Sequence, residues 1–221
     1  MTIHYIRPEF FMDANSYVLV GTESTMLIDT GTGLKLGQLL SSLERILNGR
    51  KLDIIVATHR HHDHSGCVGR LKAKFGAEAY MSEKDAVPVR EGDTNSTLAG
   101  PFGAKIEPTD IKTVKEGDEF DLGGHVLRIM ETPGHTIGSI CLYDLSTGAL
   151  FTGDTVSFNG IKRLDTPTAS PEQLTRSLER LSGLDIRGIY PGHGDPAPQS
   201  GRNRILNNLK ILELLYSDEI L

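Results

Sequence analysis

The sequence predicts one layered domain of the α/β class, or of the neighbouring α+β class. Short segments rich in β-branched residues alternate with longer segments of helical periodicity, and no low-complexity linker or short tandem repeat divides them. With 221 residues, of which 38% are hydrophobic and 24% charged, the chain can bury a sizeable core without disulfides. We therefore expect a single domain over residues 1–221.

The first half of the chain carries strand and helix signals in alternation. Runs of apolar and β-branched residues predict strands over 17–20, 25–28 and 54–57. Leucines spaced by three and four residues predict a helix over 34–48, and a second helix is expected over about 65–75.

The middle of the chain changes character. Residues 88–110 carry three prolines and three glycines with little periodicity, so we expect a long loop that is either functional or partly mobile. Residues 112–152 predict a run of strands separated by turns that contain glycine.

The last third predicts two helices and a strand. Ser170 is a suitable helix N-cap, because a proline follows at the first helical position and a glutamine stands at the capping-box position. This helix is expected to end near Leu181. A strand over 186–190 and an amphipathic helix over 202–216 complete the chain.

Charge and hydropathy limit the partners. The formal net charge of −6 argues against a general nucleic-acid binder, which usually has a basic excess, so no nucleic-acid partner is expected. The first residues do not resemble a signal peptide, and no run approaches about 18 apolar residues. We therefore expect a cytoplasmic protein without a membrane partner, and the sequence leaves a homo-oligomer open.

The most informative segment covers residues 58–66 and reads T-H-R-H-H-D-H-S-G, between a predicted strand and a predicted helix. His59 and His61 are two residues apart, so in extended backbone they point to the same side. Asp63 and His64 follow where the chain turns. Imidazoles and a carboxylate are ligands that suit zinc, iron and manganese, and without a metal they would crowd polar groups beside an apolar strand. The segment therefore predicts a metal site.

Three more potential ligands each follow a predicted strand and stand next to a glycine. They are His135 in T-P-G-H-T, Asp154 in F-T-G-D and His193 in Y-P-G-H-G. Glycine lets the backbone turn sharply and brings the neighbouring side chain in close. The G-x-S-x-G turn of serine hydrolases does not occur in the sequence.

The order H-x-H-x-D-H, P-G-H, T-G-D and P-G-H-G resembles the metallo-β-lactamase superfamily, and is most similar to its glyoxalase II-like hydrolase subgroup. The match spans roughly residues 14–194 and begins with N-S-Y at 15–17 and I-D-T-G at 28–31. It includes a segment over 158–165 that resembles the one following the metal-binding aspartate in glyoxalase-like members. The resemblance implies an αββα four-layer sandwich with metals between the sheet edges.

The resemblance also implies how two metal ions would be held. The first would be bound by His59, His61 and His135, the second by Asp63, His64 and His193, and Asp154 would bridge them. Zinc is expected first, with iron or manganese as alternatives. A hydroxide shared by the two ions could attack an ester, thioester, lactone or similar acyl bond of a small-molecule substrate. Asp63 is also expected to be catalytic, by orienting that hydroxide.

Several other polar residues have two interpretations. Asp29 either forms a hydrogen bond to a ligand histidine or caps the turn at residues 30–31. Arg163 and Asp165 either form a structural pair or touch substrate, and the structural role is favoured.

The remaining histidines and the cysteines are expected to have structural roles. His62 is expected to face outward or into a helix contact, and His4 and His125 to be ordinary strand residues. Cys67 and Cys141 are expected to be reduced and packed, with one disulfide as the alternative and, for Cys67, a metal-binding thiolate as another.

Aromatic and apolar residues in polar loops either line a substrate pocket or cover the core. The candidates for the pocket wall are Phe10, Phe11, Met12, Phe102 and Phe158.

The resemblance has limits. Glyoxalase II carries an added C-terminal helical region for the glutathione moiety, whereas residues 194–221 hold one predicted helix and few basic residues. We therefore expect acyl-bond hydrolysis as a class rather than hydrolysis of a glutathione thioester. The alternatives are a mononuclear iron persulfide dioxygenase, a phosphodiesterase or nuclease of the same superfamily, and a non-catalytic metal- or partner-binding protein.

Overall fold

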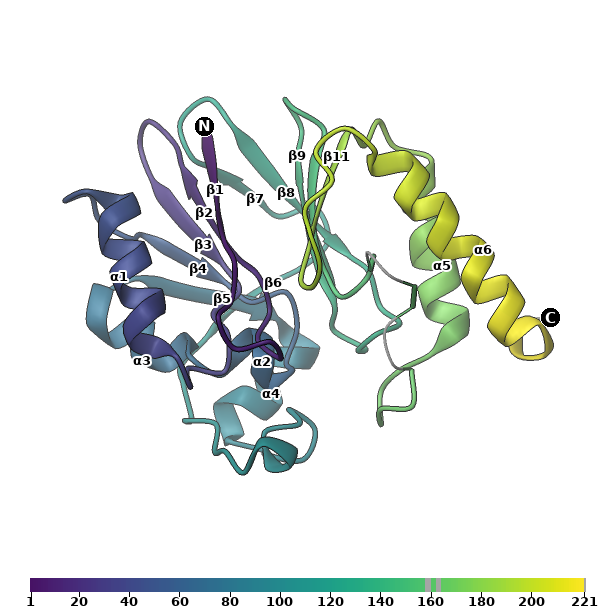
Figure 1. Ribbon diagram of the computed structural model, residues 1–221, viewed down its shortest axis with the longest axis horizontal. Coiled ribbons are helices and arrows are strands. Elements are labelled where there is room, and N and C mark those ends of the chain that lie inside the picture. The colour runs from purple at the N-terminus through teal and green to yellow at the C-terminus, as the bar shows by residue number, and fades with distance from the viewer. Residues whose placement is uncertain (158–159, 162–163, 221) are drawn as a thin grey trace.

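Two β-sheets face each other and helices cover both outer faces of the pair (Figure 1). The computed structural model describes residues 1–157, 160–161 and 164–220. The first sheet has the strand order β1-β2-β3-β4-β5-β6 and the second has the order β11-β10-β9-β8-β7. Each sheet is therefore built from one continuous half of the chain.

The strands of the first sheet precede those of the second along the chain. The first sheet consists of β1 (Thr2–Ile6), β2 (Ser16–Val20), β3 (Thr25–Ile28), β4 (Ile54–Val56), β5 (Glu78–Ser82) and β6 (Lys112–Val114). The second consists of β7 (Glu119–Asp121), β8 (Val126–Glu131), β9 (Ile140–Asp144), β10 (Ala149–Gly153) and β11 (Gly188–Pro191). Strands β3 to β6 pair in parallel, and β10 pairs in parallel with β11.

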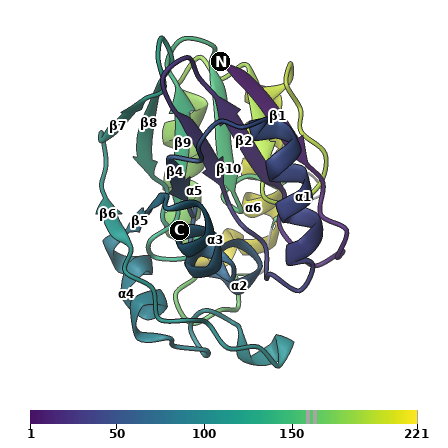
Figure 2. The same ribbon diagram turned by 90° about the vertical axis from the view of Figure 1, so that its left-hand side faces the viewer.

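The helices lie on the two outer faces. Those of the first half are α1 (Leu36–Leu47), α2 (His62–Ser65), α3 (Val68–Phe75), α4 (Glu83–Glu91) and the 3₁₀ turn η1 (Gly100–Phe102). Those of the second half are α5 (Pro171–Ser182) and α6 (Gly201–Ile220). Figure 2 looks onto the face that α1 and α3 cover, with α5 and α6 behind the sheets.

Three clusters of buried apolar side chains lie between the four layers formed by the two sheets and the helices on either side of them. Successive residues of β2 show how period-2 alternation creates them: Val18 packs toward α1 and α3, whereas Tyr17 and Leu19 pack between the sheets. In β10, Phe151 lies between the sheets and Leu150 lies against α5 and α6. The predicted αββα sandwich is confirmed.

Most of the predicted elements occur within one to three residues of their expected bounds. At the start of α5, the Ser170 hydroxyl accepts a hydrogen bond from the Gln173 amide at 3.2 Å, as the capping pattern predicts. The helix expected over 65–75 is instead two pieces, α2 and α3, and β5 was not predicted. The C-terminal helix is assigned over 201–220, with non-helical backbone at Tyr216.

The loop expected over 88–110 is shorter than predicted, because Pro88 lies inside α4. A proline within a helix leaves the carbonyl four residues earlier without its helical donor. That carbonyl belongs to Lys84, and it accepts a hydrogen bond from the Arg60 guanidinium at 2.9 Å. The side chain of Arg60 thus replaces the missing backbone donor.

No helix in the described part of the chain combines the length and apolar character needed to cross a membrane.

Candidate metal centre

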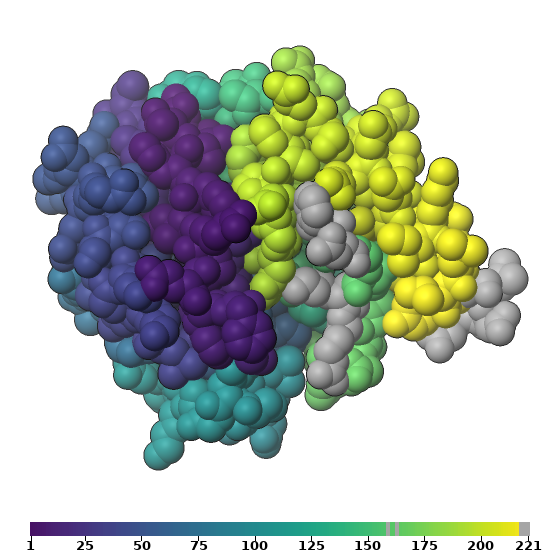
Figure 3. All heavy atoms as spheres, viewed as in Figure 1, coloured from purple at the N-terminus to yellow at the C-terminus, as the bar shows by residue number. Residues whose placement is uncertain are grey.

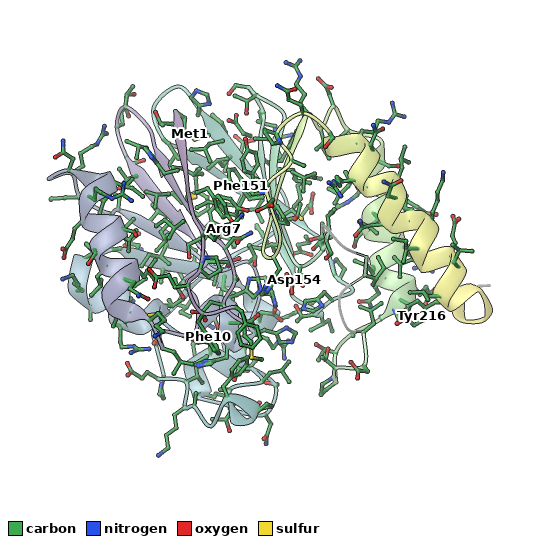
Figure 4. All side chains as sticks on the ribbon, viewed as in Figure 1. Met1, Arg7, Phe10, Phe151, Asp154 and Tyr216 are labelled. Atoms are coloured by element: carbon green, nitrogen blue, oxygen red, sulfur yellow. The ribbon has the colours of Figure 1, made fainter. Side chains whose placement is uncertain are left out.

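The seven predicted ligands converge from both sheets. His59 and His61 follow β4, and Asp63 and His64 lie in α2. The others lie in the segments that follow β8, β10 and β11 of the second sheet, namely His135, Asp154 and His193. Figure 4 places Asp154 near the centre of the molecule, between the two halves.

The first group brings three imidazoles together. His59 Nε2 lies 3.1 Å from His61 Nδ1, and His135 Nε2 lies 3.0 Å from the same atom. All three side chains are buried. Nitrogens that share a tetrahedral zinc ion at 2.0–2.1 Å are roughly 3.3 Å apart, so the group has nearly the spacing that such an ion requires.

The second group contains Asp63, His64 and His193. His193 Nε2 lies 3.0 Å from Asp63 Oδ2, and His64 Nε2 lies 3.7 Å from the same oxygen. In each group, one ligand atom per residue lies within 4.8 Å of the others.

Asp154 lies between the two groups. Its Oδ1 is 3.6 Å from His64 Nε2 and 3.9 Å from His193 Nε2, on the side of the second group. Its Oδ2 is 3.6 Å from His135 Nε2, on the side of the first. One carboxylate therefore presents an oxygen to each group.

The environment of His64 fits a metal ligand. Its Nδ1 lies 2.8 Å from Asp29 Oδ2, which fixes the ring, while the buried Nε2 has no hydrogen-bond partner among the described residues. Thr58 also donates to Asp29, from its amide at 2.8 Å and from its hydroxyl. A histidine bonded to a carboxylate through one nitrogen and free at the other is the usual arrangement at a metal site. Of the two interpretations of Asp29, the hydrogen bond to a predicted ligand histidine is confirmed.

Burial and neighbouring charges separate the pKa values in the cluster. Burial, followed by the charge of His135, lowers the pKa of His61 to about 3. Burial also holds the pKa of His59 well below its usual range. Burial alone would raise the pKa of Asp63, but His64 and His193 hold it at about 2. The uncharged imidazoles of His59 and His61 and the ionised carboxylate of Asp63 are protonation states that bind metal. Although burial opposes it, the charges of Asp29, Asp63 and Asp154 raise the pKa of His64 well above its usual range, so His64 would release a proton when it binds a metal.

Two glycines let the backbone pass close to the cluster. A Cβ atom on Gly192 would lie 2.4 Å from the His64 ring and 2.7 Å from Asp154 Oδ1. Gly153 has a φ of +47°, and a Cβ there would lie 2.4 Å from the Thr58 hydroxyl. The predicted role of glycine beside the ligands is confirmed at both positions.

A buried carboxylate that the sequence analysis missed ties two ligand loops together. Asp85 in α4 accepts hydrogen bonds from the amide and the Nε of Arg60, at 2.9 and 2.8 Å. It also accepts one from the Thr136 hydroxyl at 2.7 Å. Arg60 separates His59 from His61, and Thr136 follows His135. No local motif marks Asp85, because its partners are distant in sequence.

The segment that carries His193 is anchored by residues at the start of β2. The Asn15 side chain donates to the carbonyls of Pro191 and Gly194, at 2.9 and 2.7 Å. The Tyr17 hydroxyl donates to the Pro191 carbonyl at 2.7 Å. Figure 3 shows these segments side by side, in purple and yellow-green.

Among the described residues, the other histidines and the cysteines belong to neither group of ligands. His62 does not face outward: it is 2% exposed and its ring centroid is 5.8 Å from that of Phe102. His4 lies in β1, as expected, but His125 precedes β8 and its Nδ1 is 3.1 Å from Asp144. Both cysteines are reduced and buried, namely Cys67 and Cys141.

An open pocket of about 590 Å³ lies in front of the cluster. Phe11, Met12 and Phe102 line it as predicted, whereas Phe10 is not among its lining residues. Asp165 also lines it. The expectations for Phe158 and Arg163 fall outside the described residues.

The sandwich and the histidine–aspartate cluster at the sheet ends are features of metal-dependent hydrolases. Residues 10–193 match the family model described as Metallo-beta-lactamase superfamily. The chain therefore belongs to the metallo-β-lactamase superfamily, as its motifs predicted.

Curated relatives agree with this assignment. A probable metallo-hydrolase of Methanocaldococcus jannaschii is 36% identical over 188 residues, which are 82% of this chain and 88% of the relative. A hydroxyacylglutathione hydrolase of Rhizobium meliloti is 36% identical over 158 residues, which are 70% of this chain. The match covers only 52% of that hydrolase, so the chain spans about half of its length.

Solved structures share the fold. A metallo-beta-lactamase family protein from Thermus thermophilus superposes with a TM-score of 0.76 at 22% identity, covering 98% of this chain and 80% of that one. A protein solved in a di-iron-bound form has a TM-score of 0.75 at 26% identity, covering 94% of this chain and 98% of that one.

Proposed function

We propose that the chain is a binuclear metal-dependent hydrolase that cleaves an ester, thioester, lactone or similar acyl bond of a small molecule. The position of Asp154 carries the proposal, because its two carboxylate oxygens point toward two separate groups of ligand atoms. A mononuclear site would need only one of these groups. The partial similarity to hydroxyacylglutathione hydrolases supports acyl-bond hydrolysis as the reaction.

The predicted ligands keep their expected roles in this proposal. His59, His61 and His135 would hold one ion, Asp63, His64 and His193 the other, and Asp154 both. Two divalent ions, zinc first with iron or manganese as alternatives, would supply an activated water and neutralise charge that develops on the substrate.

Asp63 has a second role in this proposal, because it also lines the pocket. A carboxyl with a pKa near 2 is a weak base at neutral pH, so Asp63 would orient the attacking water by accepting a hydrogen bond rather than take its proton. Asp29 and Asp85 act as positioning residues, because they hold ligand-bearing segments and do not line the pocket.

Elemental analysis of the purified protein tests the metal centre. About two zinc, iron or manganese ions per chain are expected, together with hydrolysis of esters, thioesters or lactones. Asp154→Asn should lose metal, whereas Asp165→Asn is the matched control, because Asp165 lines the pocket but belongs to neither group of ligands.

Other outcomes would select the alternative functions. A single iron with oxygen consumption would indicate the persulfide dioxygenase, and cleavage of bis-p-nitrophenyl phosphate without cleavage of esters would indicate the phosphodiesterase. Absence of metal even after reconstitution would overturn the proposal.

A further inference from the structure

The pocket in front of the metal centre has apolar walls. Three segments far apart in the sequence supply them: the turn before β2, the loop around η1 and the segment before α5. Their apolar lining residues are Phe11, Met12, Leu98, Pro101, Phe102 and Pro167. Phe11 is 85% exposed and Met12 is 41% exposed. Large apolar side chains left in water beside a reactive centre indicate a surface for an apolar ligand.

The wall around η1 is built before any ligand arrives. Asp93 accepts hydrogen bonds from the Asn95 amide at 2.8 Å and the Ser96 hydroxyl at 2.6 Å. The Gly100 amide donates to the Thr94 carbonyl at 3.1 Å, which closes the loop. The His62 amide then donates to the Thr97 carbonyl at 2.7 Å, so the loop is attached to the metal-binding segment itself. Such a preformed wall can select a ligand by its shape.

Leu98 is the residue of this wall whose conformation calls for an explanation. Its φ is +58°, in the left-handed region that residues with a Cβ rarely adopt. Glycine or asparagine would occupy this position with less strain. Leu98 lines the pocket, and strained backbone that persists beside a reactive centre points to a function.

The charges of the lining favour a neutral ligand. Among the described residues, the charged side chains at the pocket surface include the carboxylates of Asp63, Asp154 and Asp165, but no lysine or arginine. Two of these carboxylates belong to the metal centre. Away from the metal centre, the described lining offers no lysine or arginine to an anionic tail, whereas a carbon chain would find apolar contacts on three sides.

We propose that this pocket binds the apolar acyl group of the substrate, an uncharged carbon chain or ring, and that Leu98 sets the chain length it accepts. The inference rests on the proposed function for the bond that is cleaved. The binding of the apolar group can be measured without cleavage.

The binding test uses straight-chain 1-alkanols from two to ten carbons, which carry no charge and no cleavable bond. Ligand-observed NMR on the zinc-reconstituted protein would give their affinities. Each added methylene should tighten binding about fourfold until the pocket is filled, since burial of one methylene contributes about that factor. Affinities that do not change with chain length would overturn the inference.

Variants of Leu98 test the assignment to this residue. Leu98→Ala should weaken the longest bound alkanol about tenfold and leave ethanol and propanol unchanged. Leu98→Gly should show the same loss without a lower Tm, because glycine removes the strain at positive φ. Leu214→Ala is the matched control: this leucine is 82% exposed on α6 and does not line the pocket.

Two results would count against the role of Leu98. One is an equal loss for short and long alkanols, and the other is no loss in either variant.

Acyl esters of p-nitrophenol separate this inference from the proposed function. If alkanols bind with chain-length dependence but no ester is cleaved, only the proposed function fails. If esters are cleaved equally at all chain lengths and the affinity for alkanols does not change with chain length, only this inference fails.

Discussion

Asp29 and His64 are joined by a hydrogen bond of 2.8 Å that aims the opposite ring nitrogen of His64 at Asp63 and Asp154. Asp29 has a φ of +57°, and its Oδ2 is the atom that bonds to His64 Nδ1. The bond sets both the tautomer and the orientation of the imidazole.

Asp29→Asn should weaken binding at the second group. Asparagine tolerates positive φ, so the backbone conformation is retained. Its neutral amide, however, does not increase the basicity of the His64 imidazole as the Asp29 carboxylate does. We expect affinity for one of two zinc ions to fall about 10- to 100-fold. Competition with a chromogenic chelator would measure it, and two unchanged dissociation constants would contradict the role of Asp29.

Asp85→Ala should destabilise the protein strongly, because it leaves the buried guanidinium of Arg60 without its partner. Arg60 Nη2 lies 2.6 Å from Asp85 Oδ1, and both side chains are buried. Breaking such a pair costs about 3–5 kcal/mol of unfolding free energy, which urea denaturation would measure. Asp110→Ala is the control: that side chain is 92% exposed, and its pair with Lys72 should contribute less than about 1 kcal/mol.

His61 should make the metal-free protein less stable in mild acid. Its pKa is about 3 in the folded state and about 6.5 in the unfolded state, so the unfolded chain binds the proton first as the pH falls. The contribution of His61 to the free energy of unfolding is fully present above pH ~6.5, and it declines toward pH ~3 by about 1.4 kcal/mol per pH unit. His61→Gln lacks this titration. The difference in unfolding free energy between the two proteins should therefore follow that slope, and equal pH profiles would contradict it.

Removal of metal should lower Tm. Ions that bind only the folded state stabilise it by mass action, by about 2.7 kcal/mol for each site at a free concentration 100 times its Kd. Calorimetry before and after dialysis against a chelator would measure the shift. Asp154→Asn should show a smaller shift than the unaltered protein, and an unchanged Tm in the unaltered protein would contradict the prediction.

The sequence predicted the fold well where a pattern is local. The strand expected over 17–20 and the capping pattern at Ser170 each depend on a few neighbouring residues, and the structure confirms both. The ligand motifs are local too, because each follows the end of a strand. The distances between motifs are not local, so pattern reasoning alone could not supply them.

The features that the sequence analysis did not predict depend on contacts between residues far apart in the sequence or on the conformation of a loop. Pro88 signals a helix break, but Arg60 satisfies the carbonyl that the proline leaves without a donor. Asp85 resembles any acidic residue of a helix until its contacts with the two ligand loops are known. Leu98 gives no signal in the sequence, because a leucine is not expected at positive φ.

The division of the chain into two halves has a consequence for assembly. One half supplies β1 to β6 with the ligands from His59 to His64, and the other supplies β7 to β11 with His135, Asp154 and His193. Metal ions bound by ligands from both halves would hold the two halves together. Two fragments cut in the turn at 115–118 should then rejoin more readily when zinc is added, so the centre would serve assembly as well as chemistry.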